Sequence, residues 1–154
     1  MKIKVAVVFV VVVLAVLQAV LFGDSPATGM VTGTEERIVT KVIDGDTIVV
    51  EGGDRIRLLD IDTPEKGEKC YKEAKGRLAE LVDGKKIKIQ RRGEDKDRYD
   101  RLLRYVFYND NNVNILLVKE GLANLYFYDK NTPYMKELLE AELHAKEDAL
   151  CVWK

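Results

Sequence analysis

Two short acidic segments contain the residues best suited to chemistry. Asp44 and Asp46 lie in the segment VIDGDTIVV, two positions apart and so on one side of an extended chain, with Gly45 between them to let the backbone bend. Two carboxylates then converge. Asp-Gly is also a strong turn signal, so a plain β-turn is the alternative interpretation of the same residues.

The second segment, RIRLLDIDTPE, gathers arginines and carboxylates around the end of a predicted strand that Thr63-Pro64 stops. Strict alternation would put Arg57 and Asp62 on opposite faces, so a shared site requires a bulge or bend before Asp62. Oxygens from Asp46, Asp62 and a backbone carbonyl suit a hard cation such as Ca²⁺, and Glu65 is near enough to act on an adjacent water. An exposed salt-bridge cluster explains the spacing equally well.

Residue scarcity excludes other chemistries. The chain has one serine, Ser25, which lies in a linker-like stretch, and one histidine, His144, which lies in a helical stretch. A Ser-His-Asp triad and a multi-histidine zinc site are therefore excluded.

The N-terminus indicates export. Residues 5–22 form an unbroken run in which Gln18 is the only polar residue, and Lys2 and Lys4 precede it. As a helix the run would span roughly 27 Å at 1.5 Å per residue, which suits a signal sequence or a single-pass anchor. Positive residues before the run predict a body outside the cytoplasm, secreted or membrane-anchored. No clear cleavage site decides between these alternatives.

The rest of the chain divides into a linker and one domain. We assign residues 1–22 to the signal peptide or anchor, residues 23–36, rich in Gly, Thr, Pro and Ser, to a flexible linker, and residues 37–154 to the domain. Within the domain, β-rich patterns separated by turn residues predict five strands. They cover residues 36–43, 47–51, 55–61, 85–92 and 102–108.

Three helices are predicted beside these strands. The first is amphipathic, with a core face at Ala74, Leu78, Leu81 and Val82 and an end at Asp83-Gly84. The second covers residues 113–120, and the third opens at Thr132-Pro133, where Thr132 can cap it. This order predicts an α+β fold, a five-stranded OB-fold β-barrel with about three helices, preceded by the N-terminal hydrophobic helix.

The two cysteines are expected to pair, because exported chains form disulfides and the number is even. A Cys70–Cys151 bond would tie the C-terminal tail to the middle of the fold. Two buried free thiols are the alternative, since pairing geometry is not visible in a sequence.

The charge of the body does not by itself indicate a nucleic-acid partner. Beyond position 23 there are 23 basic and 26 acidic side chains, a net charge of about −3. Attraction of a polyanion would need a local cluster, and an ordinary solvated strand face is an equally good interpretation of the one available. That basic cluster comprises Lys85, Lys86, Lys88, Arg91 and Arg92.

Taken together, VIDGDTIVV and RIRLLDIDTPE resemble the signature of the staphylococcal nuclease family. The resemblance continues through DRYDRLLRYVF, GLANLYFY and the closing LCVWK, so it covers residues 38–153. It implies an OB-fold phosphodiesterase that uses Ca²⁺ as cofactor, attacks DNA and RNA with water, and leaves 3′-phosphate ends.

The resemblance also assigns roles to single residues. It implies metal ligands at Asp46, Asp62 and the Thr63 carbonyl, a general base at Glu65, catalytic arginines at Arg57 and Arg101, and substrate contacts at Arg98, Tyr99, Tyr126 and Tyr128. The sequence departs from the family near the second arginine, where Asp100 and Leu102 stand in place of glycines, and it lacks one residue before the tyrosine pair. An added carboxylate at Asp100 is expected to lower affinity for phosphate.

These observations predict a monomeric, extracytoplasmic, calcium-dependent nuclease that acts on single-stranded DNA or RNA. It would contact the membrane through its N-terminal segment if that segment is not cleaved. The alternative is a noncatalytic OB-fold module that binds nucleic acid or a protein partner outside the cell. The filled site favours the enzyme, because a binding module would be expected to lose some of these carboxylates or arginines.

Overall fold

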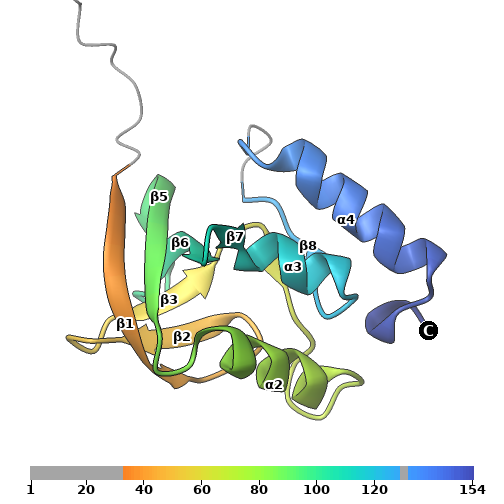
Figure 1. Cartoon of the computed structure of the whole chain (residues 1–154), viewed down its shortest axis with the longest axis horizontal. Coiled ribbons are helices and arrows are strands. Elements are labelled where there is room, and N and C mark those ends of the chain that lie inside the picture. The colour runs from red at the N-terminus through yellow and green to blue at the C-terminus, as the bar shows by residue number, and fades with distance from the viewer. Residues whose placement is uncertain (1–32, 129–131) are drawn as a thin grey trace, which may run out of the picture. The chain divides into compact units, whose positions relative to one another are not determined.

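The computed structural model describes residues 33–128 and 132–154 of the chain (Figure 1). The predicted hydrophobic helix, residues 1–22, and most of the predicted linker, residues 23–36, lie outside the described residues. Strand β1 begins at Thr34, so the last three residues of the predicted linker belong to the body. Over the ranges that the structure describes, no helix is long and apolar enough to cross a membrane.

Five strands close into a barrel (Figure 1). They are β1 (Thr34–Val42), β2 (Thr47–Val50), β3 (Arg55–Leu58), β5 (Lys86–Lys96) and β6 (Leu102–Tyr108). The first three form an antiparallel meander, and β5 pairs with both β1 and β6. A parallel pairing between β3 and β6 completes the ring. The closed five-stranded barrel confirms the predicted OB-fold and the α+β class.

Side chains from the strands and from α2 (Tyr71–Val82) fill one core. The β-branched side chains of strand residues such as Ile48, Ile56 and Val106 are fully buried. The predicted helix α2 contributes Ala74, Leu78 and Val82 to the same cluster. Because this core involves every barrel strand, it holds the strand ends, and the loops beyond them, in fixed positions.

Helix α3 (Val113–Lys119) attaches the helical layer to the barrel. The Asn112 side chain caps it by accepting hydrogen bonds from the amides of Asn114 and Ile115. Asn114 is fully buried, where its Oδ1 accepts from Val106 N at 3.1 Å and its Nδ2 donates to Leu59 O at 2.8 Å. One amide thus fixes α3 to β6 and to the chain just after β3.

Helix α4 (Met135–Glu147) begins later than predicted. Tyr134 occupies its N-cap position, and no side chain caps the helix there. Thr132 does not cap, because its hydroxyl is hydrogen-bonded to the buried Tyr105 hydroxyl instead. A tertiary contact has therefore taken the group that local sequence assigned to the helix.

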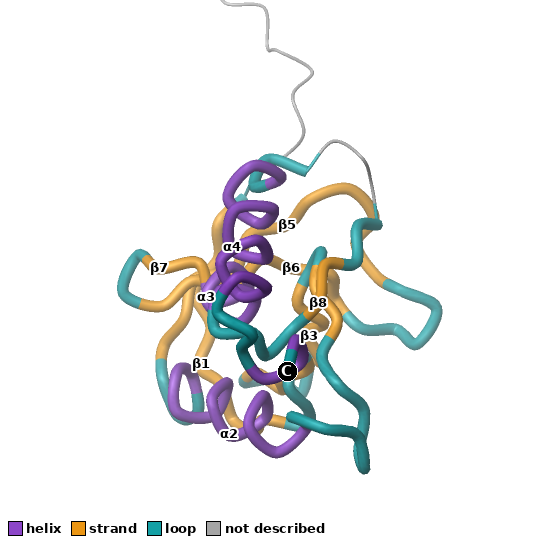
Figure 2. Tube along the Cα trace, turned by 90° about the vertical axis from the view of Figure 1, so that its right-hand side faces the viewer, coloured by secondary structure: helices purple, strands orange, loops and turns teal. Residues whose placement is uncertain are grey.

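The predicted strand 55–61 is broken into two. It ends at Leu58 and resumes as β4 (Ile61–Asp62), which pairs with β8 (Asn124–Leu125) outside the barrel (Figure 2). Between the two parts Asp60 adopts a left-handed φ of 60°. The chain bends at this point and leaves the barrel wall. A further short strand, β7 (Asn111–Asn112), pairs with the end of β6.

The predicted disulfide is present. Cys70 at the start of α2 is bonded to Cys151 in the C-terminal turn η1 (Cys151–Trp153), with 6.0 Å between the Cα atoms. The free-thiol alternative was wrong. The bond ties the end of the chain to the helix that closes the core.

Candidate active site

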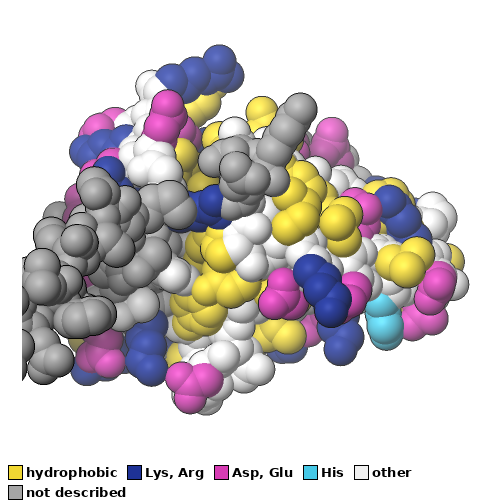
Figure 3. All heavy atoms as spheres, turned by 90° about the horizontal axis from the view of Figure 1, so that it is seen from above, with side chains coloured by type: hydrophobic (Ala, Val, Ile, Leu, Met, Phe, Trp, Pro, Cys, Tyr) yellow, Lys and Arg dark blue, Asp and Glu magenta, His cyan; other side chains and the backbone are white. Residues whose placement is uncertain are grey.

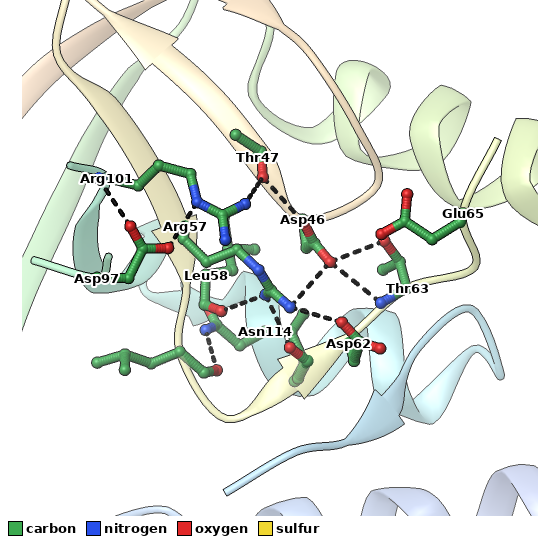
Figure 4. Close-up of polar contacts among 12 residues, drawn as sticks. Asp46, Thr47, Arg57, Leu58, Asp62, Thr63, Glu65, Asp97, Arg101 and Asn114 are labelled. Atoms are coloured by element: carbon green, nitrogen blue, oxygen red, sulfur yellow. Dashed lines mark hydrogen bonds and ion pairs between the residues drawn. The ribbon is translucent and has the colours of Figure 1, made fainter. Parts of the chain in front are cut away.

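Asp46 lies in the connection between β1 and β2 and is only 7% exposed. Its Oδ1 accepts from the Thr47 hydroxyl at 2.9 Å, and its Oδ2 accepts from the backbone and hydroxyl of Thr63 at 3.1 and 3.0 Å (Figure 4). A Cβ at Gly45 would lie 2.7 Å from Thr63 Oγ1 and 2.9 Å from Ala74 Cβ. Glycine is needed here for close approach of the Thr63 loop and α2.

Asp44 and Asp46 converge as the sequence predicted, within a turn. Both line a cleft of about 580 Å³ beside the barrel. Residues 43 and 44 donate their amides to Thr47 O, and the chain bends over residues 44–46 between β1 and β2. One oxygen of Asp44, Oδ1, is buried and has no hydrogen-bond partner in the part of the chain that the structure describes.

Arg57 is the buried centre of the cleft, with 4% of its surface exposed. Its Nη1 donates to the carbonyls of Leu58 and Ile61, both at 2.7 Å, and its Nη2 donates to Asp62 Oδ1 at 2.7 Å and lies 3.2 Å from Asp46 Oδ2. The bend between β3 and β4 makes these contacts possible. It places Asp62 on the side of Arg57, as a shared site requires.

Arg101 reaches the same cleft from the loop before β6. Its Nε donates to Asp97 Oδ2 at 2.7 Å, and its Nη1 donates to the Thr47 hydroxyl at 3.2 Å. Because Thr47 donates in turn to Asp46, a chain of polar contacts joins the two predicted arginines through one carboxylate (Figure 4). Sequence reasoning missed Thr47 and Asp97. Their signals were adjacency to Asp46 and a position four residues before Arg101.

The cleft is rich in negative charge. Glu65 is exposed at its edge, and its pKa is raised by partial burial and by the charges of the neighbouring carboxylates. Burial also raises the pKa of Asp62, with Asp46 adding to the effect and Arg57 opposing it. Burial is the largest cause of both shifts, and the neighbouring carboxylates add to it.

The residues present fit a hard cation in part. Asp46 and Asp62 both contact Arg57 Nη2, so their oxygens converge, and Thr63 follows directly in the chain. Among the described residues, no group of three or more His, Cys, Asp or Glu side chains is placed to hold a metal alone. Two carboxylates and a carbonyl would leave several of the six to eight positions around Ca²⁺ to water or substrate.

Comparison with known proteins agrees with this geometry. Residues 55–154 match the family model described as staphylococcal nuclease homologue. The chain belongs to the staphylococcal nuclease family. It is 34% identical over 143 residues to the thermonuclease of Staphylococcus intermedius, covering 86% of this chain and 85% of that protein. It is 30% identical over 141 residues to the thermonuclease of Staphylococcus hyicus, with 85% and 83% coverage.

A Bacillus relative is longer than this chain. Endonuclease YncB of Bacillus subtilis (strain 168) is 40% identical over 124 residues, which is 73% of this chain and 59% of YncB. The chain therefore spans about three-fifths of the length of that relative.

All four residues that were predicted to bind substrate line the cleft, namely Arg98, Tyr99, Tyr126 and Tyr128. Tyr99 is 55% exposed, with the guanidiniums of Arg98 and Arg101 at 4.8 and 5.5 Å from its ring centre. Tyr126 and Tyr128 are exposed and pack edge to face at 5.2 Å. These aromatic surfaces are available for stacking.

Asp60 positions the tyrosine pair, a role that the sequence did not reveal. Its carbonyl accepts from Tyr126 N at 3.0 Å, and its buried carboxylate accepts from Tyr128 N at 3.4 Å and from the Tyr105 hydroxyl. The bend that brings Asp62 to Arg57 therefore also fixes the aromatic wall of the cleft.

The departures from the family pattern near Arg101 have local explanations. Asp100, with a left-handed φ of 62°, is exposed and bonded to Lys96 at 2.7 Å. Leu102 begins β6 and pairs with Ile56 where the barrel closes.

The basic cluster is not an unopposed positive patch. Lys86 pairs with Glu36, Lys88 with Asp110, and Arg91 with Asp95. Lys85 donates to carbonyls at the end of α2. Basic and acidic side chains are also interspersed on the face drawn in Figure 3. The interpretation as a solvated strand face holds for Lys86, Lys88 and Arg91, whereas Lys85 lies before β5 and contacts α2. Arg92 is the remaining member of the cluster.

Proposed function

We propose that this chain is a Ca²⁺-dependent nuclease that hydrolyses phosphodiester bonds of DNA and RNA and leaves 3′-phosphate ends. The observation that carries the proposal is the cleft itself. In it, two carboxylates suited to a cation lie beside two anchored guanidiniums, with a third carboxylate at the edge. Phosphoryl transfer needs little beyond this, because catalysis depends on positioning and on neutralising charge.

The arginines act on the phosphate in this proposal. Arg57 and Arg101 neutralise charge that builds on the phosphoryl oxygens, because the planar guanidinium group matches phosphate geometry. The carbonyls of Leu58 and Ile61 hold Arg57, and Asp97 holds Arg101, so neither guanidinium has to be ordered during the reaction.

Glu65 is the general base in this proposal. Its raised pKa makes it a better acceptor of a proton from an attacking water than an isolated carboxylate. Asp46, Asp62 and the Thr63 carbonyl would hold Ca²⁺, which when bound supplies positive charge to the phosphoryl oxygen as a Lewis acid. In this proposal Tyr99 contacts the nucleotide phosphate, Tyr126 and Tyr128 pack beside the base, and Arg98 also binds the substrate.

The location follows from the N-terminal sequence. The uncharged run after Lys2 and Lys4 supports a protein that is secreted, or anchored through residues 5–22, with its body outside the cytoplasm. Nucleic acid in that compartment would be the substrate, and the body would act as a monomer.

The test is cleavage of end-labelled single-stranded DNA and RNA by the full-length chain, in Ca²⁺ and in chelator. Cleavage of both in Ca²⁺ alone is expected, with product ends that a 3′-phosphatase can modify. Binding of the oligonucleotides without cleavage under any condition would reject the enzyme and support the noncatalytic binding module.

A further inference from the structure

A second hollow lies beside the cleft. Its volume is about 350 Å³, within the range of roughly 300 to 1,000 Å³ that small-molecule sites occupy. Leu59, Leu103, Tyr105 and Tyr128 give it mostly apolar walls, and Arg92 lines it as well. Of the predicted site residues, Tyr128 is the only one among its described lining residues. We call this hollow the side pocket.

The side pocket adjoins the cleft. Leu103, Tyr128 and Glu94 line both hollows. Tyr128 is 44% exposed, so part of its ring is free to contact a ligand. The shared walls thus put the side pocket next to the hollow that Arg57 and Arg101 line.

Arg92 gives the side pocket a chemical preference. Its Nη1 is buried and lacks a hydrogen-bond partner among the residues that the structure describes. Buried polar groups are nearly always paired, and leaving a charged donor unpaired is costly. The carboxylate of Asp60 is already occupied by Tyr105 and Tyr128. The buried group without a partner is thus the Arg92 Nη1 donor, which suits a ligand that carries a hydrogen-bond acceptor.

We propose that the side pocket binds the nucleobase next to the scissile phosphate, with Arg92 Nη1 donating to an exocyclic carbonyl oxygen of that base. The proposal rests on the proposed nuclease function. Proteins recognise unpaired bases by stacking them on aromatic side chains and bonding their edges, and arginine most often reads the O6 and N7 acceptors of guanine. Adenine would present its amino donor to another donor. The side pocket therefore prefers guanine, thymine or uracil to adenine.

The test is single-turnover cleavage by the full chain in Ca²⁺, using single-stranded oligonucleotides that differ in one base beside the cleaved bond. Wild type is expected to cleave with guanine or thymine at that position about tenfold faster than with adenine, on the scale of one arginine–base contact. Arg92→Met keeps the unbranched stem but removes the donor, so cleavage with guanine or thymine should slow until the preference over adenine is lost. Arg92→Lys keeps a donor and should retain part of the preference.

Arg91→Met is the matched control. Arg91 is the exposed neighbour of Arg92 and pairs with Asp95 at 3.4 Å, so its removal should leave the base preference intact. Thermal unfolding checks that each variant is folded. A wild type that cleaves no oligonucleotide would reject the nuclease function itself. Cleavage without a base preference, or a preference unchanged in both Arg92 variants, would overturn the side-pocket proposal alone.

Discussion

The two arginines of the cleft are held by different kinds of partner. Arg57 donates to backbone carbonyls, which do not titrate, whereas Arg101 depends on the carboxylate of Asp97. Burial alone would raise the pKa of Asp97, but hydrogen bonds from the backbone and side chain of Arg101 outweigh it, so the pKa is lowered. Protonation of Asp97 in acid should therefore release Arg101, whereas the carbonyls that hold Arg57 are unaffected by pH.

Asp97 should stabilise the fold at neutral pH and not in acid. A carboxyl whose folded-state pKa lies below its unfolded value contributes stability above the unfolded value, and that contribution is lost as pH falls through the folded pKa. Asp97→Asn should therefore lower the free energy of unfolding most at pH 7, with the deficit shrinking below about pH 4. Urea denaturation across this range measures it. Asp110→Asn, at an exposed carboxylate, is the control, and an equal deficit at every pH would contradict the expectation.

Glu65 should show a conflict between stability and activity. Four other carboxylates repel its charge, namely Asp44, Asp46, Asp62 and Glu68. Glu65→Gln is expected to raise the melting temperature in chelator, while lowering single-turnover cleavage by about 10² to 10⁴, the range typical of a general base. Glu140→Gln on α4 should change neither quantity. A Glu65→Gln variant that melts lower and cleaves normally would exclude both roles.

At the scale of elements, the bend between β3 and β4 organises the cleft. Asp60 should be costly to replace, because Asp60→Ala strains a left-handed backbone and leaves the buried Tyr105 hydroxyl without its carboxylate partner. The expected loss is about 1 to 3 kcal/mol for the lost hydrogen bonds to the buried carboxylate, beyond the backbone cost. Asp100→Ala is the matched control, since Asp100 has a similar φ but is exposed. Equal losses for the two variants in urea denaturation would show that the buried contacts contribute nothing.

Hydrophobic pattern predicted most of the elements correctly, because alternating and helical periodicities report directly which face meets the core. Strands β1, β2, β3, β5 and β6 and helix α2 were all visible in this way. The pattern did not reveal β4 or β8, which have two residues each and are held by pairing with distant chain. The late start of α4 was also invisible, since the partner of Thr132 is Tyr105, 27 positions away.

The residues of the candidate site could be predicted from the sequence about as far as the fold could. Family resemblance supplied the carboxylates and arginines, and the sequence itself required the bend before Asp62. It could not reveal Thr47, Asp97 or Asp60 as positioning residues, because their roles depend on contacts that only the closed barrel creates. The requirement at Gly45 also depended on a distant neighbour, the Thr63 loop.

At the scale of the whole molecule, the disulfide joins residues 81 positions apart. In the chain-entropy account, removing it should destabilise the protein by at most about 4 to 5 kcal/mol. The double variant Cys70→Ala, Cys151→Ala should therefore unfold at lower urea concentration than wild type. Reducing agent should shift the wild type toward the variant and leave the variant unchanged. Coincident unfolding curves for oxidised and reduced wild type would show that the bond adds no stability.

The whole cleft works as a nuclease site only if its two halves have separate tasks. Asp46 and Asp62 would hold the cation, while Arg57 and Arg101 would act on the phosphate. The two halves are in direct contact, because Asp46 and Asp62 both lie against the Nη2 atom of Arg57. Kinetic measurements on single variants separate their tasks.

Single-turnover cleavage of a short oligonucleotide across a Ca²⁺ series tests this division directly. Asp46→Ala should lose activity at low Ca²⁺ and recover part of it at high Ca²⁺, because a site missing one ligand still binds weakly. Arg57→Ala should be slower by on the order of 10² or more at every Ca²⁺ concentration, and Arg57→Lys should restore little, since lysine lacks the planar fork. Arg91→Ala, at an exposed arginine that does not line the cleft, is the control. Wild-type cleavage that persists in chelator, or an Arg57→Ala variant as fast as wild type, would contradict the proposed mechanism.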